Sequence, residues 1–257
     1  MHSFKQLILV WLFFTAFLTN AQNEEIVKGL PSYFGLQIKP LVPGDFLSKS
    51  QITVVNETFI GKFSQQYGYS FGAVVRVGLT KLLSLETGIN QVKRNYKVDF
   101  SLPDSNAFGN TSFGIISYDI PITAMIYIQL SDKLFTNASL GTAGVFYPSN
   151  VAATVVANDK YLFVSEGRRN KHLAFEINGN LGFEYRTEKK GFYYLGMSAR
   201  VPFSPIFTVA ASYEYKNSVK NLAIGQVNGA YLSLDLRYFF PSIKNKGEQF
   251  NKGPLEQ

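Results

Sequence analysis

The chain has 257 residues, of which 46% are hydrophobic and 17% charged, and its formal net charge is +7. So many apolar and so few charged side chains exclude an intrinsically disordered chain. The sequence has no cysteine, which excludes disulfide frameworks, thiolate zinc sites and a lipoprotein-type lipid anchor. Its 15% aromatic content favours strands over helices.

Residues 1–21 are predicted to be a secretory signal peptide. A short segment with Lys5 precedes an apolar run from Leu7 to Leu18, and small residues lie before Gln22, where we expect cleavage. The alternative is a transmembrane anchor, but a helix of this length rises only ~18 Å, too little for a bilayer core of ~30 Å. We therefore expect an exported chain, with a folded domain over residues 22–240 and a flexible periplasmic tail over residues 241–257.

After the signal peptide, apolar and polar residues alternate with a period of two, as in strands with two unlike faces. Between residues 172 and 186, for example, the even positions include Glu176 and Glu184, while the odd positions are mainly apolar. The same test predicts eight strands, at residues 30–40, 69–80, 83–98, 112–130, 133–147, 171–187, 191–215 and 229–240. Pro202 leaves open whether the seventh is one tall strand or ends near Phe203.

The predicted connections alternate strictly between long and short. Tight turns lie at residues 79–82, 131–133 and 187–191, and long polar connections at residues 41–68, 99–111, 148–170 and 216–228. A membrane barrel with short periplasmic turns, long outer loops and an even strand number has this arrangement. The sequence therefore predicts an all-β fold, an eight-stranded antiparallel up-and-down transmembrane β-barrel.

The polar face of these strands carries small residues and matched charges, which suits a narrow lumen better than an open surface. An eight-stranded barrel is just wide enough for its side chains to fill it, and charges confined there must pair or be hydrated. We predict an ionic network in the lumen, with Arg76 facing Glu86 across the second hairpin; individually hydrated charges are the alternative. The network comprises Arg76, Glu86, Arg94, Asp119, Glu176, Glu184, Arg186, Arg200, Asp235 and Arg237.

Three segments carry a resemblance to a known family. They are residues 83–88 (LSLETG) followed by Tyr96, residues 118–122 (YDIPI), and the closing residues 232–240 (LSLDLRYFF). In their order and spacing, the chain resembles the PorT-like outer-membrane β-barrel family from Gly29 to Phe240. The resemblance implies an outer-membrane location in a Gram-negative bacterium, and one namesake of the family takes part in protein secretion. It implies no active-site residues, because members of the family differ in role.

A catalytic site is not expected. His172 could serve as the general base of a lipid-modifying barrel enzyme, with Ser165 as its nucleophile. However, Arg168, Arg169 and Lys171 flank the histidine, and no acid is placed to orient it, so a rim position is the simpler interpretation. A single histidine in the exported chain and no cysteine cannot form a typical zinc site. We expect no enzymatic activity, no metal and no cofactor.

Much of the basic excess lies in or beside the long connections, at Lys49, Lys62, Lys160, Arg168, Arg169, Lys171, Lys216 and Lys220. Nucleic acid is not an expected partner of an exported chain with scattered bases. Outer-membrane lipid is an expected partner, because these basic side chains could bind phosphates of lipopolysaccharide. An equal alternative is that the charges only keep the connections soluble. Strand-end tyrosines suit aromatic girdles at the membrane surfaces, at Tyr69, Tyr96, Tyr147, Tyr193, Tyr215 and Tyr238.

Together these features predict a monomeric, non-enzymatic barrel of the bacterial outer membrane. Its role would be structural or binding, through an envelope protein partner at the outer loops or by assisting a secretion or assembly machinery. A narrow porin-like channel, a lipid-modifying enzyme and a soluble lipocalin-like carrier are the alternatives. The carrier requires Phe175 and Ile122 inside the fold, with Glu176 and Arg186 in water.

Overall fold

The computed structural model describes residues 32–45, 47–80, 83–187, 190–216 and 218–241. The predicted signal peptide, and the predicted tail beyond Pro241, lie outside these residues. In the described part of the chain the strands are β1 (Ser32–Pro43), β2 (Gln51–Asn56), β3 (Phe59–Gly78), β4 (Leu83–Leu102), β5 (Ala107–Gln129), β6 (Leu134–Phe146), β7 (Val151–Ala157), β8 (Tyr161–Arg169), β9 (Leu173–Arg186), β10 (Phe192–Pro202), β11 (Phe207–Tyr215), β12 (Ser218–Val227) and β13 (Tyr231–Phe239). No helix of the described residues is long and apolar enough to cross a membrane.

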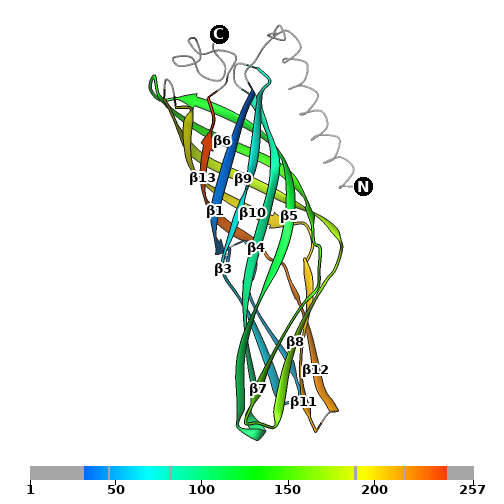
Figure 1. Ribbon diagram of the computed structural model, residues 1–257. Helices are drawn as coiled ribbons and strands as arrows, with labels where there is room; N and C mark the ends of the chain where they lie inside the picture. Colours follow the sequence, from blue (N-terminus) through cyan, green and yellow to red (C-terminus); the bar gives the residue numbers. More distant parts are fainter. Residues whose placement is uncertain (1–31, 46, 81–82, 188–189, 217, 242–257) are drawn as a thin grey trace, which may run out of the picture.

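Eight of these thirteen strands pair side by side in a ring (Figure 1). The order around the ring is β1, β13, β10, β9, β6, β5, β4 and β3, and β3 pairs in turn with β1. Every pairing in the ring is antiparallel. β1 begins and β13 ends beside the tight connections that follow β3, β5 and β9, which we call the short-turn end. The all-β, antiparallel barrel predicted from the sequence is confirmed.

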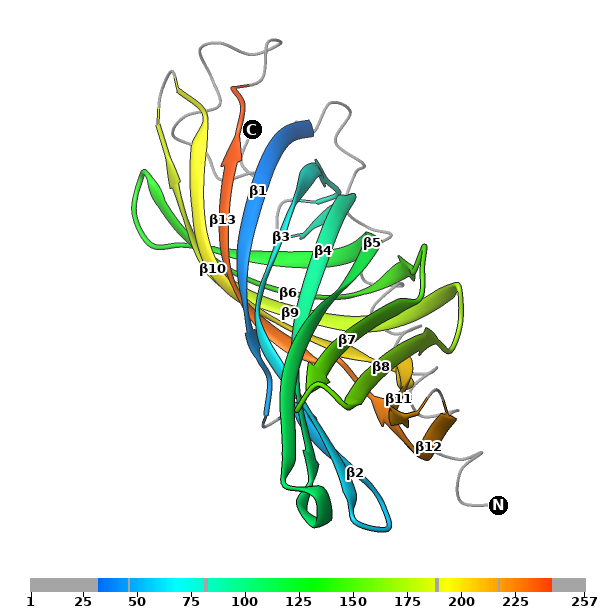
Figure 2. The ribbon, with the colours of Figure 1, turned by 60° about the horizontal axis from the view of Figure 1, so that its bottom comes forward.

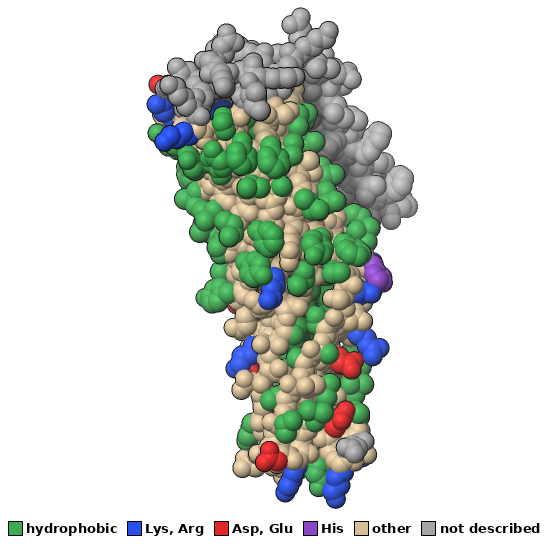
Figure 3. Space-filling view, in the orientation of Figure 1, with side chains coloured by type: hydrophobic (Ala, Val, Ile, Leu, Met, Phe, Trp, Pro, Cys, Tyr) green, Lys and Arg blue, Asp and Glu red, His purple; other side chains and the backbone are tan. Residues whose placement is uncertain are grey.

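The ring has apolar residues outside and polar residues inside. Along β9, Phe175 is 55% exposed, whereas Glu176 is fully buried. Exposed apolar side chains form a band on the outer surface of the barrel, at the end nearer the short turns, which we call the apolar belt (Figure 3). Its residues are Phe34, Leu36, Ile38, Phe71, Ile89, Ile120, Ile122, Ile126, Ile128, Leu140, Phe175, Leu181, Phe183, Leu195, Met197, Leu234 and Leu236. This polarity is that of a membrane-spanning β-barrel. The soluble carrier, which requires Phe175 inside, is wrong.

Beyond the belt, the barrel continues into a second region, which we call the extension (Figures 1 and 2). It consists of β2, the far halves of β3, β4 and β5, and a second sheet in the order β12, β11, β8 and β7. The two sheets share an apolar core that includes Phe59, Phe63, Phe100, Phe163 and Phe207. The extension therefore has an apolar interior, as a water-soluble β-protein does.

The prediction about the long connections is wrong. The connections at residues 41–68, 99–111, 148–170 and 216–228 are not outer loops, since most of their residues form strands of the extension. Of the two alternatives left open for residues 191–215, the strand that ends near Phe203 is correct, because β10 ends at Pro202; a further strand, β11, then begins at Phe207 in the other sheet. Pro202 and Pro205 explain the break, since proline has no N–H to donate to a neighbouring strand.

β4 shows how one strand serves both regions. It keeps the same face inward throughout, but the chemistry of both faces changes near Lys93. Inward-facing Glu86 at the belt gives way to Phe100 in the extension, while outward-facing Ile89 gives way to Lys97. Such a reversal is expected where a strand passes from lipid into water, because its apolar face turns toward lipid but away from water. We therefore expect the membrane surface at the level of Lys93.

The core of the extension offers a direct test of this division. Phe163 is fully buried, and its ring centroid lies 5.2 Å from that of Phe100 and 5.9 Å from that of Phe59. Phe163→Ala is expected to cost about 3–5 kcal/mol, because it leaves a cavity among the rings. The extension should become sensitive to limited proteolysis, while the barrel keeps its heat-modifiable mobility on gels. Phe108→Ala, at a 60% exposed position, is the control, and equal cleavage of both variants would contradict the prediction.

Candidate functional site

The lumen of the ring holds the charged residues predicted from the sequence. Each of the ten is 6% exposed or less, and together with Lys39, which is also 6% exposed, they gather in two clusters. The turn-end cluster consists of Lys39, Arg76, Glu86, Glu184, Arg186, Asp235 and Arg237. The mid-barrel cluster consists of Arg94, Asp119, Glu176 and Arg200.

Arg76 is at the centre of one half of the turn-end cluster. It faces Glu86 across the β3–β4 hairpin, and its Nη2 lies 3.0 Å from Glu86 Oε2. Its Nη1 lies 2.5 Å from Glu184 Oε2 on β9, and the other oxygen of Glu184 lies 2.6 Å from Arg186 Nη2. This network therefore bridges the lumen between β3 and β9. Its members Arg76 and Glu184 are 108 residues apart in the sequence.

Asp235 is the acceptor in the other half of this cluster. Its Oδ2 lies 2.6 Å from Arg237 Nη2 and 3.2 Å from Lys39 Nζ. Ser198 and Ser233 each donate a hydrogen bond of 2.6 Å to its two oxygens. Arg237 also pairs with Glu86, which joins this half to the other.

The mid-barrel cluster repeats the arrangement closer to the extension. Arg94 Nη2 lies 2.5 Å from Glu176 Oε1, and Arg200 Nη1 lies 2.6 Å from Asp119 Oδ2 and 3.9 Å from Glu176 Oε2. Asn90 donates a hydrogen bond of 2.6 Å to the other oxygen of Asp119. The acids and bases of the lumen are thus held against one another from four or more strands.

Aromatic rings complete the clusters, and sequence reasoning missed them. The guanidinium of Arg186 lies 4.1 Å from the ring centroid of Phe135, and that of Arg76 lies 4.2 Å from that of Phe239. Such stacking stabilises partly desolvated guanidinium groups. The signal was available, because these rings share the inward parity of their strands with the charged residues.

Two glycines make room for one of these rings. Gly182 on β9 faces Gly196 on β10, and a Cβ atom at either position would collide with the Tyr194 side chain. The Tyr194 ring can therefore lie across the lumen wall, with its centroid 4.5 Å from the Arg237 guanidinium. Its hydroxyl donates to Asn137 at 3.3 Å.

The predicted aromatic girdle is only partly right. Tyr193 is half-exposed at the belt, and Tyr69 is exposed near Lys93 at the other edge. Tyr96 and Tyr147 are buried instead, because they share the inward face of their strands where the interior turns apolar. Tyr147 accepts a hydrogen bond of 3.2 Å from Arg94 and so closes the mid-barrel cluster on the side of the extension.

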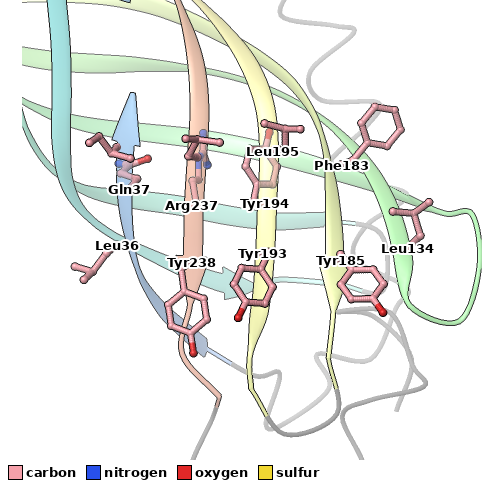
Figure 4. Close-up of a pocket in the computed structure, with 12 residues that line it drawn as sticks. Leu36, Gln37, Leu134, Phe183, Tyr185, Tyr193, Tyr194, Leu195, Arg237 and Tyr238 are labelled. Carbon is pink, nitrogen blue, oxygen red and sulfur yellow. The ribbon is translucent and has the colours of Figure 1, made fainter. Parts of the chain in front are cut away.

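A shallow groove lies on the outer surface of the belt near the short-turn end. It has a volume of about 620 Å³ and apolar walls that include Leu36, Phe183 and Leu195. Figure 4 shows the rings of Tyr193 and Tyr238 side by side on neighbouring strands, with their hydroxyls at the short-turn end. This edge of the groove is an aromatic girdle of the kind found at membrane surfaces.

The two residues considered for catalysis lie in different surroundings. Ser165 is fully buried in the extension, whereas His172 is exposed and accepts a hydrogen bond of 3.3 Å from Arg169 Nη2. The structure does not bring them together as a nucleophile and its base. Within the described residues there is also no group of three or more side chains suited to hold a metal ion.

The fold and the polarity of its faces define a membrane-spanning β-barrel with a charge-filled lumen. Among the solved structures that are similar to it are two bacterial outer-membrane proteins. The outer membrane protein OprG from Pseudomonas aeruginosa is 11% identical, with a TM-score of 0.48, and the match covers 82% of this chain and 96% of that one. An outer membrane channel from Pseudomonas putida F1 is 8% identical, with a TM-score of 0.21, over 85% of this chain and 98% of that one.

No family model matches the sequence, and no curated protein matches it. Membership of the PorT-like family therefore stays a prediction. Both TM-scores are below 0.5, so neither similarity carries an argument about function.

Proposed function

We propose that the chain is a non-enzymatic β-barrel of the bacterial outer membrane, with a closed lumen and with the extension as its working surface. Its role is structural or binding, through contacts made outside the membrane. The observation that supports this proposal most directly is the pairing of the buried lumen charges. Outer-membrane barrels have short turns on the periplasmic side, so the extension would lie outside the cell.

The lumen leaves little room for a passing solute. An ion crossing it would have to separate pairs such as Arg76 with Glu184 and Arg94 with Glu176, which lie at 2.5 Å. Breaking a buried pair is costly, because each partner then lacks its counter-charge. Beyond the charges, the inward faces of the same strands enter the mainly apolar core around Phe63 and Phe113, which is poorly suited to a hydrated ion.

A narrow channel is the second candidate, favoured by the polar lumen itself, since conducting barrels are also polar inside. Single-channel recording in planar bilayers separates the two. The wild-type barrel should be silent, and removing the Arg76–Glu86 pair with a double Arg76→Ala, Glu86→Ala variant should produce small conductance steps. Phe108→Ala, outside the lumen, should stay silent. Regular steps from the wild-type protein would refute the closed barrel and support the channel.

The barrel would act as a monomer in the membrane. Every strand of the ring is paired on both sides, so the belt has no free strand edge to join another copy. The extension, in contrast, exposes apolar side chains in water, among them Val55 on β2 and Leu222 and Ile224 on β12. We propose that an envelope protein partner binds to this region. Through such binding the barrel would assist a secretion or assembly machinery.

A further inference from the structure

We propose that the segment from Arg168 to His172 binds a phosphate of outer-leaflet lipopolysaccharide, whose acyl chains lie on the adjacent belt. The inference rests on the proposed outer-membrane orientation and names the lipid partner of the barrel. The segment joins the end of β8 to the start of β9. It therefore lies where the chain passes from the extension into the belt, at the level of lipid headgroups.

Arg169 is the fixed cation of this segment. Its Nη1 donates a hydrogen bond of 2.6 Å to the Pro148 carbonyl, and its Nη2 donates one of 3.3 Å to His172 Nε2. Its backbone N–H donates to Asn150 Oδ1 at 3.1 Å. A guanidinium held in this way loses little side-chain freedom on binding a phosphate, and it can offer its remaining N–H donors in a planar fork.

Asn170 anchors the segment to residues 205–208 of the same chain. Its Nδ2 donates to the Pro205 carbonyl at 2.9 Å, and its Oδ1 accepts a hydrogen bond of 2.7 Å from Thr208. The backbone N–H of Asn170 donates to the Ile206 carbonyl at 3.0 Å. The basic side chains on either side are therefore displayed from a well-bonded connection.

The charge of the site favours an anion. Arg168 and Lys171 are exposed on either side of Arg169 and Asn170. One acid faces the site, since Glu166 Oε2 lies 3.3 Å from Arg168 Nη2, and both of these side chains are largely exposed. Three cations against one carboxylate leave a positive surface.

Apolar side chains adjoin these cations on the membrane side. Leu173 and Phe175 on β9 are 56% and 55% exposed, and Leu173 pairs with exposed Phe146 on β6. Phe203, 64% exposed, lies next to Phe175, since its N–H donates to the Phe175 carbonyl at 3.1 Å. In Figure 3, the apolar belt gives way to a surface that carries basic and acidic side chains. A phosphorylated glycolipid, with anionic groups above its acyl chains, has the complementary distribution of charge.

The test uses the full-length exported protein in detergent micelles, with diphosphorylated lipid A as the probe and native mass spectrometry as the readout. Arg169→Gln, and separately Arg168→Gln with Lys171→Gln, should weaken lipid A binding about tenfold, as expected for lost charge-assisted hydrogen bonds. Lys160→Gln is the matched control, because Lys160 lies in the turn at the far end of β8. It should bind as the wild type does.

Two further arms separate the lipid from its phosphate. Phe203→Ser should weaken binding of lipid A, and dephosphorylated lipid A should bind the wild type no better than it binds Arg169→Gln. Inorganic phosphate at millimolar concentration should not displace the lipid. Equal lipid A binding by Arg169→Gln and the wild type would overturn the proposal, as would full displacement by inorganic phosphate. Because none of these variants changes the lumen, their conductance reports on the closed barrel independently.

Discussion

Asp235→Ala is expected to lower the free energy of unfolding by about 3–5 kcal/mol, the usual cost of breaking a buried ion pair. Asp235 accepts contacts from Lys39, Arg237, Ser198 and Ser233. Its removal leaves the Lys39 ammonium, which is 6% exposed, without that carboxylate. Urea titration of the barrel refolded into lipid vesicles, followed by tyrosine fluorescence or gel mobility, measures the change.

The matched control is another aspartate in an ion pair at the surface. Asp99 Oδ1 lies 2.7 Å from Lys97 Nζ, but both side chains are about half as exposed as free ones. Asp99→Ala should therefore cost only about 0–1 kcal/mol. If the two substitutions cost the same, the lumen charges are individually hydrated, and the argument for a closed barrel loses its basis.

Ile122→Arg is expected to destabilise the membrane-inserted barrel by about 2–4 kcal/mol, the cost of an arginine facing lipid near the bilayer midplane. Ile122 is 58% exposed on β5, near the middle of the belt. The measurement is the same urea titration in vesicles. In detergent micelles, where the headgroup region is easier to reach, the loss should be smaller.

The control for Ile122→Arg lies on the same strand and the same face. Asn110 is exposed in the extension, opposite Asp99 on β4, so Asn110→Arg places the same side chain in water beside an acid. Its cost should be near zero. A similar loss for both variants would mean that the membrane surface is not at the level of Lys93.

The barrel could be predicted because apolar and polar residues alternate along its strands. The alternation between Phe175 and Glu176 or between Ile122 and Thr123 assigns each side chain to a face, and the tight turns fix which strands are adjacent. The pairing of Arg76 with Glu86 follows from one hairpin. The contact between Arg76 and Glu184 does not, because those strands are distant in sequence and meet only across the lumen.

The extension could not be predicted in the same way. In water a strand hides its apolar face, so residues such as Lys62 and Asn110 on the outside make these segments resemble polar loops. Apolar and polar residues still alternate there, with Phe63 and Phe100 on the inside. However, the many polar residues of these segments favour a loop over a strand. A change in which face is apolar, while parity is kept, is the signal that marks the boundary between lipid and water.

β4 continues without a break through that boundary, and its length sets how far the extension reaches above the membrane surface. From Lys93 to its end at Leu102 the strand advances roughly 30 Å at about 3.3 Å per residue. Because the strand is tilted, the height above the membrane is smaller than this length. The two sheets brace it against bending, so any protein that docks at the tip is kept at a constant stand-off from the headgroups.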